Sequence, residues 1–316
     1  MLGTACGSAP DDPAQHDDAR LRGTISMSGA FALYPLAVKW GEEFTKINPD
    51  VRFDIQGGGA GKGMTDMLAG SVQLGMISRA IGEEELAKGA YPIAVAKDAV
   101  LATVSSTNPH LAALKARGVT KEDLENIWIK GTVKTWGDLL GDGSSDVISV
   151  YTRSDAAGAP ETWAKFLGGA QEDLQGVGVF GDPGLADAVT KDPLGIGFNN
   201  VNYVYDIHTQ HPFPTLAVVP LDLDGSRSIS PNEDLYATLD VLNTAIVDGL
   251  YPSPPARPLY FTTLNAPKDP LLLAFLGWVL TDGQRFVPEA GYVPLPKALV
   301  EEEHLKLKGA PATSAK

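Results

Sequence analysis

Apolar and polar positions near the start of the chain follow two different periods. Leu36, Trp40, Phe44 and Ile47 recur every three or four residues, so they form one apolar stripe on a predicted helix. Short apolar runs elsewhere alternate or cluster over four or five residues, which is typical of strands. The predicted strands are Thr24–Met27, Val51–Ile55, Leu74–Ile77, Val100–Val104 and Val147–Tyr151.

Further helices are marked by their ends. Thr120 followed by Asp123 predicts a helix start, and Asp182 before Pro183 predicts an N-cap with proline at the first helical position. The apolar run Leu271–Leu280 predicts a buried helix and is too short to span a bilayer. Two more predicted helices are Gly61–Ala69 and Pro160–Leu167. Strands that alternate with helices predict an α/β protein with parallel sheets.

Length and charge narrow the class of protein. A chain of 316 residues with 44% hydrophobic residues can bury a sizeable core, and its length predicts two lobes. The net charge of -14 argues against nucleic acid and anionic membrane surfaces as partners. An anionic ligand would therefore have to be attracted by local groups and not by the field of the whole protein.

Two loops of small residues each precede a predicted helix. They are Ser28–Pro35, with the sequence SGAFALYP, and Gln56–Gly63, with the sequence QGGGAGKG. The N-terminus of a helix presents unpaired N–H groups and a partial positive charge, and small residues let a ligand approach the backbone. Both loops are therefore candidate sites for a small anion.

The only cysteine, Cys6, cannot form a disulfide within the chain. Small residues precede it and a polar tract follows, which resembles the end of a bacterial lipoprotein signal. We expect residues 1–20 to be a truncated signal and disordered tether, with lipidation at Cys6, and residues 304–316 to be a flexible tail. The alternative is a disordered tail with an isolated thiol.

Seven segments in chain order carry a more specific resemblance, and together they cover most of the chain from Gly23 to Leu295. They are similar to segments of the PstS-type phosphate-binding proteins of bacterial ABC importers. The segments are SGAFALYPLAVKWGEEF, DIQGGGAGKGMTDMLAGSVQLGMISRAI, VTKEDLENIWIKGTVKTWGDL, VYTRSDAAGAPETW, KDPLGIGFNN, RPLYFTT and VLTDGQRFVPEAGYVPL.

This resemblance implies an α/β fold of the two-lobed, type II-like periplasmic-binding-protein class, with strands that cross between the lobes and a ligand in the cleft. The crossings are expected near Lys97–Val104 and Arg257–Thr262. Lobe one would then be residues 21–98 plus 259–303, and lobe two residues 99–258.

The resemblance also implies a set of ligand-binding residues. In the family, side-chain hydroxyls from three loops bind phosphate, and the corresponding positions here hold Ala30 and Phe31, then Ala60, then Ala157 and Ala159. Backbone N–H groups would have to replace those hydroxyls. The expected ligand-binding residues are Ser28, Ala30, Phe31, Ala60, Ser78, Arg79, Arg153, Asp155, Gly158 and Ala159.

Arg153 is the expected main charged contact, because the planar guanidinium can bond two oxygens of a tetrahedral anion at once. Asp155 would orient Arg153 or accept a proton from a protonated ligand. Arg79 has an alternative role in an ion pair on the surface of its lobe, and Ser28 has one as a helix N-cap.

Residues 222–233 match the spacing of a calcium loop. The carbonyl of Ser228 and the apolar Ile229 occupy positions 7 and 8 of that loop, as the motif requires. Two features oppose the match: Arg227 occupies the position where the motif has glycine, and a predicted strand, not a helix, precedes the loop. The alternative is a polar connection in which Pro231 starts the next helix. The candidate calcium ligands are Asp222, Asp224, Ser226, Ser228, Ser230 and Glu233.

No enzyme motif is complete. A P-loop would need glycine and a hydroxyl where Gln56 and Gly63 stand, and His208 and His211 lack acidic partners. We therefore expect a periplasmic or cell-envelope binding protein, attached to the membrane only through its lipid anchor, that captures phosphate for an ABC permease and needs no cofactor beyond a possible calcium ion. The alternative is a sensor or scaffold of the same fold whose altered cleft binds another ligand.

Overall fold

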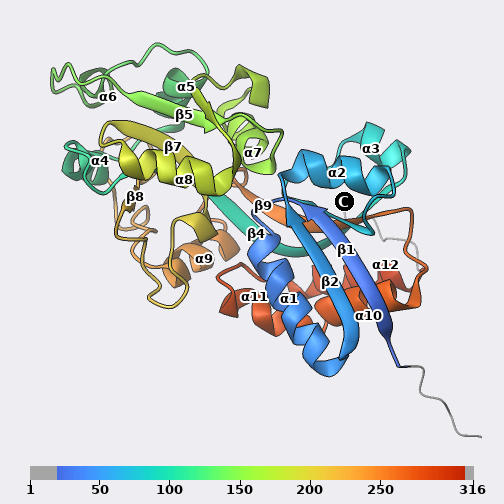
Figure 1. Ribbon diagram of the computed structural model, residues 1–316. Coiled ribbons are helices and arrows are strands. Elements are labelled where there is room, and N and C mark those ends of the chain that lie inside the picture. Colours follow the sequence, from blue (N-terminus) through green and yellow to red (C-terminus); the bar gives the residue numbers. More distant parts are fainter. Residues whose placement is uncertain (1–19, 310–316) are drawn as a thin grey trace, which may run out of the picture.

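The computed structural model describes residues 20–309, which form two lobes joined by long strands (Figure 1). The strands are β1 (Arg22–Gly29), β2 (Asp50–Gly57), β3 (Leu74–Ile77), β4 (Ala90–Ser105), β5 (Ser149–Arg153), β6 (Val177–Val179), β7 (Gly195–Asn200), β8 (Leu216–Val218) and β9 (Ala256–Leu264). They follow each other through both lobes in the order β2-β1-β3-β9-β4-β7-β5-β6, and β8 pairs with β4 beside this path.

Strand β4 joins the two lobes. Its residues 90–99 pair antiparallel with β9, with a bulge between Ala94 and Ala96, and its residues 100–104 pair with β7 of the other lobe. A single continuous strand therefore belongs to both lobes, and β9 lies beside it at the crossing. This arrangement confirms the predicted two-lobed α/β architecture with crossing strands.

Lobe one is organised around a core that draws on residues 25–96 and 259–292. Strand β1 lies between β2 and β3 and is parallel to both. On α1, Leu36, Trp40 and Phe44 are buried as the stripe predicts, whereas Ile47 is 60% exposed because it is the last residue of the helix. The helices of this lobe are α1 (Tyr34–Ile47), α2 (Ala60–Leu68), α3 (Glu83–Ala87), α10 (Pro270–Val279), α11 (Phe286–Glu289) and α12 (Lys297–Leu307).

Lobe two has its own core, drawn from residues 99–256 and Val293. Its centre is aromatic: the ring of Trp163 packs edge-on against Trp128, at 5.5 Å, and stacks on Phe198, at 5.7 Å. The helices are α4 (Leu111–Arg117), α5 (Lys121–Trp128), α6 (Trp136–Leu140), α7 (Gly158–Leu167), α8 (Gly181–Lys191) and α9 (Leu239–Val247). Short 3-10 helices lie at Gln171–Asp173, Val201–Tyr203 and Asp282–Arg285.

Several predicted element ends can be compared with the structure. Thr120 caps α5 through the N–H of Asp123, as predicted. The prediction that Asp182 is an N-cap is wrong, because α8 begins at Gly181 and the Asp182 carboxylate turns into the protein interior. The strand predicted at Val147 begins two residues later, at Ser149.

The alternative interpretation of residues 222–233, in which Pro231 starts the next helix, can also be compared with the structure. Helix α9 begins at Leu239, with Thr238 as its cap, so Pro231 does not start it. Across residues 20–309, no helix is both long enough and apolar enough to cross a bilayer. The tail expected to be flexible from residue 304 begins later than predicted, because α12 continues to Leu307, which packs against the core of lobe one. The predictions for Cys6 and for the tail beyond residue 309 lie outside the described residues.

Candidate functional site

Loops from both lobes meet between the facing ends of α2 and α7. The N–H of Gly61 donates to the carbonyl of Ala156 across the lobes, at 3.1 Å. Gly59 has φ of 87°, and a Cβ there would lie 2.9 Å from Oδ2 of Asp155. Only glycine combines that backbone conformation with so close an approach, so the predicted glycine loop is one of the parts of lobe one that touch lobe two.

Two helix N-termini open at this meeting point. Helix α2 begins at Ala60 and α7 at Gly158. The N–H groups in the first turn of a helix have no acceptor within the helix, and they carry its partial positive charge. A Cβ on Gly158 would clash with the hydroxyl and backbone of Ser78. The structure therefore brings Ala60, Ser78, Gly158 and Ala159, four of the residues expected to bind a ligand, into one region.

Arg153 ends β5 at the base of this region, and its side chain is fully buried. Its Nε and Nη2 donate to the two oxygens of Asp155, at 2.8 and 2.5 Å. Its Nη1 lies 2.7 Å from Oδ2 of Asp182, a charge contact in which the N–H is not aligned for a hydrogen bond. The guanidinium is thus held in one orientation by two carboxylates.

Asp155 stays ionised because its partners outweigh its burial. Burial acts to raise the pKa of this carboxyl, but the hydrogen bonds and charge of Arg153 and the N–H of Gly181, 3.1 Å from Oδ1, bring the pKa below its ordinary value. Oδ2 faces the Gly59 loop of lobe one. A fixed carboxylate oxygen therefore points toward the space between the lobes.

A buried polar chain links Arg153 to the crossing strands. Nδ2 of Asn200 donates to Oδ1 of Asp182, at 2.6 Å, and Nη2 of Arg257 donates to Oδ1 of Asn200. The same Nη2 of Arg257 lies 3.6 Å from Oδ2 of Asp98. None of these four residues was identified from the sequence as part of the site, and the helix-start pattern at Asp182 pointed to a different role.

Burial shifts the pKa values of the two carboxyl groups in this buried polar chain, Asp98 and Asp182. Burial raises the pKa of Asp98 to about 6, against the opposing charge of Arg257. Burial also raises the pKa of Asp182 above its ordinary value, although Arg153 opposes the shift. Protonation of either group is therefore easier in the folded protein than in the unfolded chain.

Ser28 and Arg79 are both engaged with protein groups. Oγ of Ser28 donates to Oδ2 of Asp66 at 2.7 Å, and the residue at the N-cap of α1 is Leu33. Arg79 makes a two-pronged ion pair with Glu85, at 2.9 and 2.6 Å. The contacts of Arg79 match the ion-pair alternative, and those of Ser28 match neither ligand contact nor helix capping.

Phe31 places an aromatic ring at one of the positions where the resemblance implies a phosphate-binding hydroxyl. The guanidinium carbon of Arg153 lies 5.9 Å from the centre of this ring, and the ring of Phe180 from lobe two meets it edge-on at 6.3 Å. The carbonyl of Phe31 accepts from the hydroxyl of Tyr203, at 3.3 Å. Phe31 thus covers Arg153 from the lobe-one side and helps to exclude water from it.

The calcium-like loop is closed by its own hydrogen bonds. Carboxylate oxygens of Asp222, Asp224 and Glu233 lie within 4.8 Å of one another. Asp222 accepts the N–H groups of residues 225–227, at 2.8 to 3.1 Å. Arg227 has φ of 59°, the left-handed conformation that glycine normally supplies at this position of a calcium loop.

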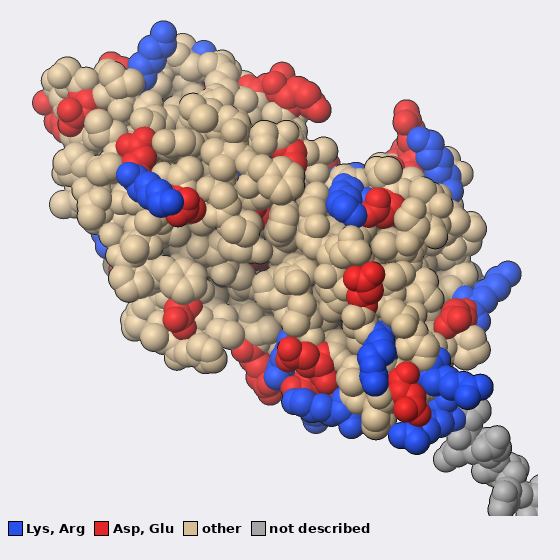
Figure 2. All heavy atoms as spheres, in the orientation of Figure 1, with Lys and Arg blue, Asp and Glu red and all other residues tan. Residues whose placement is uncertain are grey.

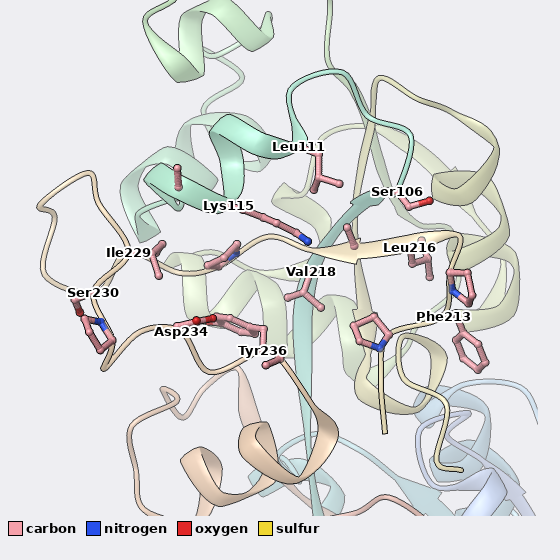
Figure 3. A pocket seen from close by; sticks show the side chains of 17 residues that line it. Ser106, Leu111, Lys115, Phe213, Leu216, Val218, Ile229, Ser230, Asp234 and Tyr236 are labelled. Atoms are coloured by element: carbon pink, nitrogen blue, oxygen red, sulfur yellow. The ribbon is translucent and has the colours of Figure 1, made fainter. Parts of the chain in front are cut away.

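On the face of the protein that Figure 2 shows, basic and acidic side chains lie intermixed on both lobes, and the surface is hollowed between the lobes. A groove of about 730 Å³ in lobe two lies elsewhere, between β8 and the segment of residues 229–237 (Figure 3). Of the residues expected to bind a ligand or metal, only Ser230 lines that groove.

Known proteins support the fold and the resemblance. The family described as the PBP superfamily domain matches residues 14–283. The phosphate-binding protein PstS of Pseudomonas aeruginosa is 28% identical, covering 95% of this chain and 93% of the relative.

Two solved structures have the same fold. A Clostridium perfringens protein, described as a phosphate ABC transporter substrate-binding protein with bound phosphate, has a TM-score of 0.71 at 20% identity over 87% of this chain and all of its own. An ABC-type phosphate transport receptor from Vibrio cholerae has a TM-score of 0.62 at 18% identity over 86% of this chain and all of its own.

Proposed function

Because this chain belongs to the PBP superfamily, we propose that it is a solute-binding protein that captures inorganic phosphate between its lobes and delivers it to an ABC permease. The observation that carries this proposal is the buried Arg153, fixed by two carboxylates where two helix N-termini from different lobes meet. Backbone N–H groups near Phe31, Ala60 and Gly158 would supply donors for the anion's oxygens, and Arg153 would supply the positive charge.

The carboxylates around Arg153 favour an anion that carries a proton. Asp155 and Asp182 bring two negative charges to one guanidinium, so a fully ionised oxyanion meets repulsion here. Monohydrogen phosphate can instead donate its O–H to Oδ2 of Asp155, which faces the lobe-one loop. Sulfate has no proton to donate at neutral pH, and we expect it to bind more weakly.

Calorimetric titration of the protein with phosphate, arsenate, sulfate and small organic anions tests the proposal. We expect saturable binding of phosphate and arsenate at one shared site, and weaker binding of sulfate. Asp155→Asn should reduce the ratio of the sulfate dissociation constant to the phosphate dissociation constant. A change in this ratio indicates loss of proton acceptance by Asp155, whereas a general loss of affinity would weaken both anions equally. If phosphate shows no saturable binding between the lobes, the proposal fails.

The second candidate function is a sensor or scaffold with a different ligand. It is favoured by the alanines at positions 30, 60, 157 and 159, which leave the region around Arg153 with fewer side-chain hydrogen-bond donors than hydroxyl residues would. A small organic anion that binds more tightly than phosphate in the same titration would support this candidate. Attachment through Cys6 at the cell envelope belongs to the proposal as well, and labelling with a lipid precursor in cells would test it.

A further inference from the structure

The buried polar chain behind Arg153 contains more carboxyl groups than cations. Arg153 pairs with Asp155 and Asp182, at 2.5 and 2.7 Å. Nη2 of Arg257 lies 3.6 Å from Oδ2 of Asp98. Two guanidinium groups therefore face three carboxyl groups, and apart from Asp155 each of these residues is at most 5% exposed. When all five groups are ionised, one negative charge is unbalanced in the interior, which is costly.

The weakest-held of these negative charges is that of Asp98. Its Oδ2 has no hydrogen-bond partner among the residues that the structure describes, and the distance to Arg257 is beyond hydrogen-bond length. Asp182 is better held, because its Oδ1 accepts from Nδ2 of Asn200 at 2.6 Å and its Oδ2 contacts Arg153. A proton that removes the unbalanced charge therefore belongs on Asp98.

Contacts between side chains run without a break from Asp98 to the proposed anion site. Nη2 of Arg257 contacts Asp98 and also donates to Oδ1 of Asn200. Asn200 donates to Asp182, and Asp182 contacts Arg153. Charges interact more strongly through such an interior than through water, so negative charge added at Arg153 makes the ionised form of Asp98 less favourable.

The groups that face Asp98 from the surrounding elements leave the proton to the carboxyl groups. Burial raises the pKa of each facing phenol, so the phenols stay neutral where carboxyl groups titrate, and a guanidinium does not deprotonate in proteins. The facing groups are Arg257 from β9, Asp182 from α8, Tyr203 from the 3-10 helix, and Tyr251 and Tyr292 from loops.

We propose that capture of an anion at Arg153 is coupled to uptake of one proton from the solvent by Asp98, which offsets part of the negative charge that the anion brings. This inference rests on the proposed function, because it concerns the same site. Without an anion the pKa of Asp98 is about 6, and the bound anion raises it further. The affinity for the anion therefore gains from protonation of Asp98 as the pH falls toward about 6, and this gain levels off below that pH.

The test is calorimetric titration of the full chain with sodium phosphate at several pH values between about 5 and 8. Asp98→Asn keeps the shape of the side chain and cannot ionise. The ratio of the two dissociation constants, wild type over Asp98→Asn, cancels the titration of phosphate itself. We expect the wild type to bind about threefold or more weakly than Asp98→Asn near pH 8, and the two to bind equally near pH 5.

The matched control is Asp187→Asn, which removes a carboxylate that is 58% exposed on α8. It should bind phosphate like the wild type at every pH. A second measurement needs no variant: in carbon NMR spectra of the wild type, labelled in the aspartate carboxyl groups, one resonance should titrate near pH 6 without phosphate and at a higher pH with saturating phosphate.

The proposal is overturned if the ratio of dissociation constants for wild type and Asp98→Asn is the same from about pH 5 to pH 8. If Asp98→Asn does not fold, the NMR titration decides, and an unchanged midpoint for every aspartate carboxyl group overturns the proposal. Absence of saturable phosphate binding would contradict the proposed function as well, whereas binding with a constant ratio contradicts only the coupling to Asp98.

Discussion

Arg79 at the end of β3 and Glu161 in the first turn of α7 form an ion pair between the lobes, with Nε of Arg79 3.0 Å from Oε2 of Glu161. Glu85 holds the other edge of the same guanidinium within lobe one. Burial raises the pKa of Glu161, and Arg79 opposes that shift. One arginine is therefore fixed by its own lobe and presented to the other lobe.

We predict that Glu161→Gln weakens ligand binding modestly and speeds ligand release. The side chain of Glu161 is 42% exposed, so water and salt screen the pair, and we expect at most about 1 kcal/mol, or about fivefold in affinity. Stopped-flow release of phosphate at low and at high salt measures the effect, which should shrink with added salt. Equal release rates for Glu161→Gln and wild type at low salt would show that the pair does not help to hold the lobes around the ligand.

Arg153→Ala should weaken phosphate binding at least about thirtyfold, because it removes a buried charged contact worth roughly 2–5 kcal/mol. It should also lower the melting temperature, since Asp155 and Asp182 would lose their shared cation. Arg153→Lys keeps the charge without the planar fork, so its melting temperature should fall less. Titration calorimetry and thermal unfolding give the two readouts.

The control for Arg153 is Arg52→Ala, which removes an exposed arginine of β2 that donates to the carbonyl of Pro49. It should leave phosphate affinity unchanged. A dissociation constant for Arg153→Ala equal to that of the wild type would remove Arg153 from the site.

Asp98 predicts a pH dependence of stability. Its pKa of about 6 in the folded protein exceeds the ordinary value of 3.8, so the native state holds this proton more tightly than the unfolded chain does. The stability contributed by this group is present below the unfolded pKa and is lost as the pH rises through about 6. Asp98→Asn, which cannot ionise, should therefore melt at a higher temperature than the wild type near pH 8, and the difference should shrink toward about pH 4.

Several groups face Asp98 and set the size of this effect. They are Arg257 from β9, Asp182 from α8, and the N–H groups of Ala99 and Val201. Asp187→Asn is the control, because it removes a carboxylate that is 58% exposed on the same lobe. A melting difference for Asp98→Asn that stays constant between about pH 4 and pH 8 would contradict the raised pKa.

Glu233→Gln should destabilise the loop of residues 222–233 even in the presence of a chelator. Oε1 of Glu233 accepts from the N–H groups of Leu223 and Asp224, at 2.6 and 3.3 Å, and Oε2 accepts from the N–H and hydroxyl of Ser230, at 3.0 and 2.7 Å. An amide nitrogen in place of one oxygen meets donors, at a cost of about 1–3 kcal/mol. Thermal unfolding measures this loss of stability, and the control is Glu301→Gln, which changes an exposed glutamate.

The same variants test the predicted calcium site. Calcium that binds only the folded state should raise the melting temperature of the wild type, and Glu233→Gln should lose that response because it lacks the bidentate carboxylate. Phosphate affinity should not change with calcium. Identical melting of the wild type with calcium and with chelator would mean that the loop is held by hydrogen bonds alone.

Local patterns in the sequence predict much of the fold. The stripe on α1, the cap at Thr120 and the strand β3 follow from periodicity and from short-range hydrogen bonding, which depend on neighbours a few residues away. Longer elements are predicted less completely. Only the second half of β4 stands out, because it is buried on both faces and contains a continuous apolar run, whereas the first half mixes buried and half-buried residues without a regular period.

The sequence by itself also predicts local sites for an anion: the small-residue loops before α1 and α2 and, through the resemblance, an arginine at the end of β5. Asp155, two residues further on, is a partner that the sequence predicts for that arginine, but tertiary structure alone decides its second carboxylate, Asp182, and the polar chain beyond it. Asp182, Asn200, Arg257 and Asp98 come from four separate elements, and each shows an ordinary polar pattern in the sequence. A polar residue has the same appearance in the sequence whether its side chain is exposed to water or buried. Only folding brings a distant partner within hydrogen-bond distance and removes the water.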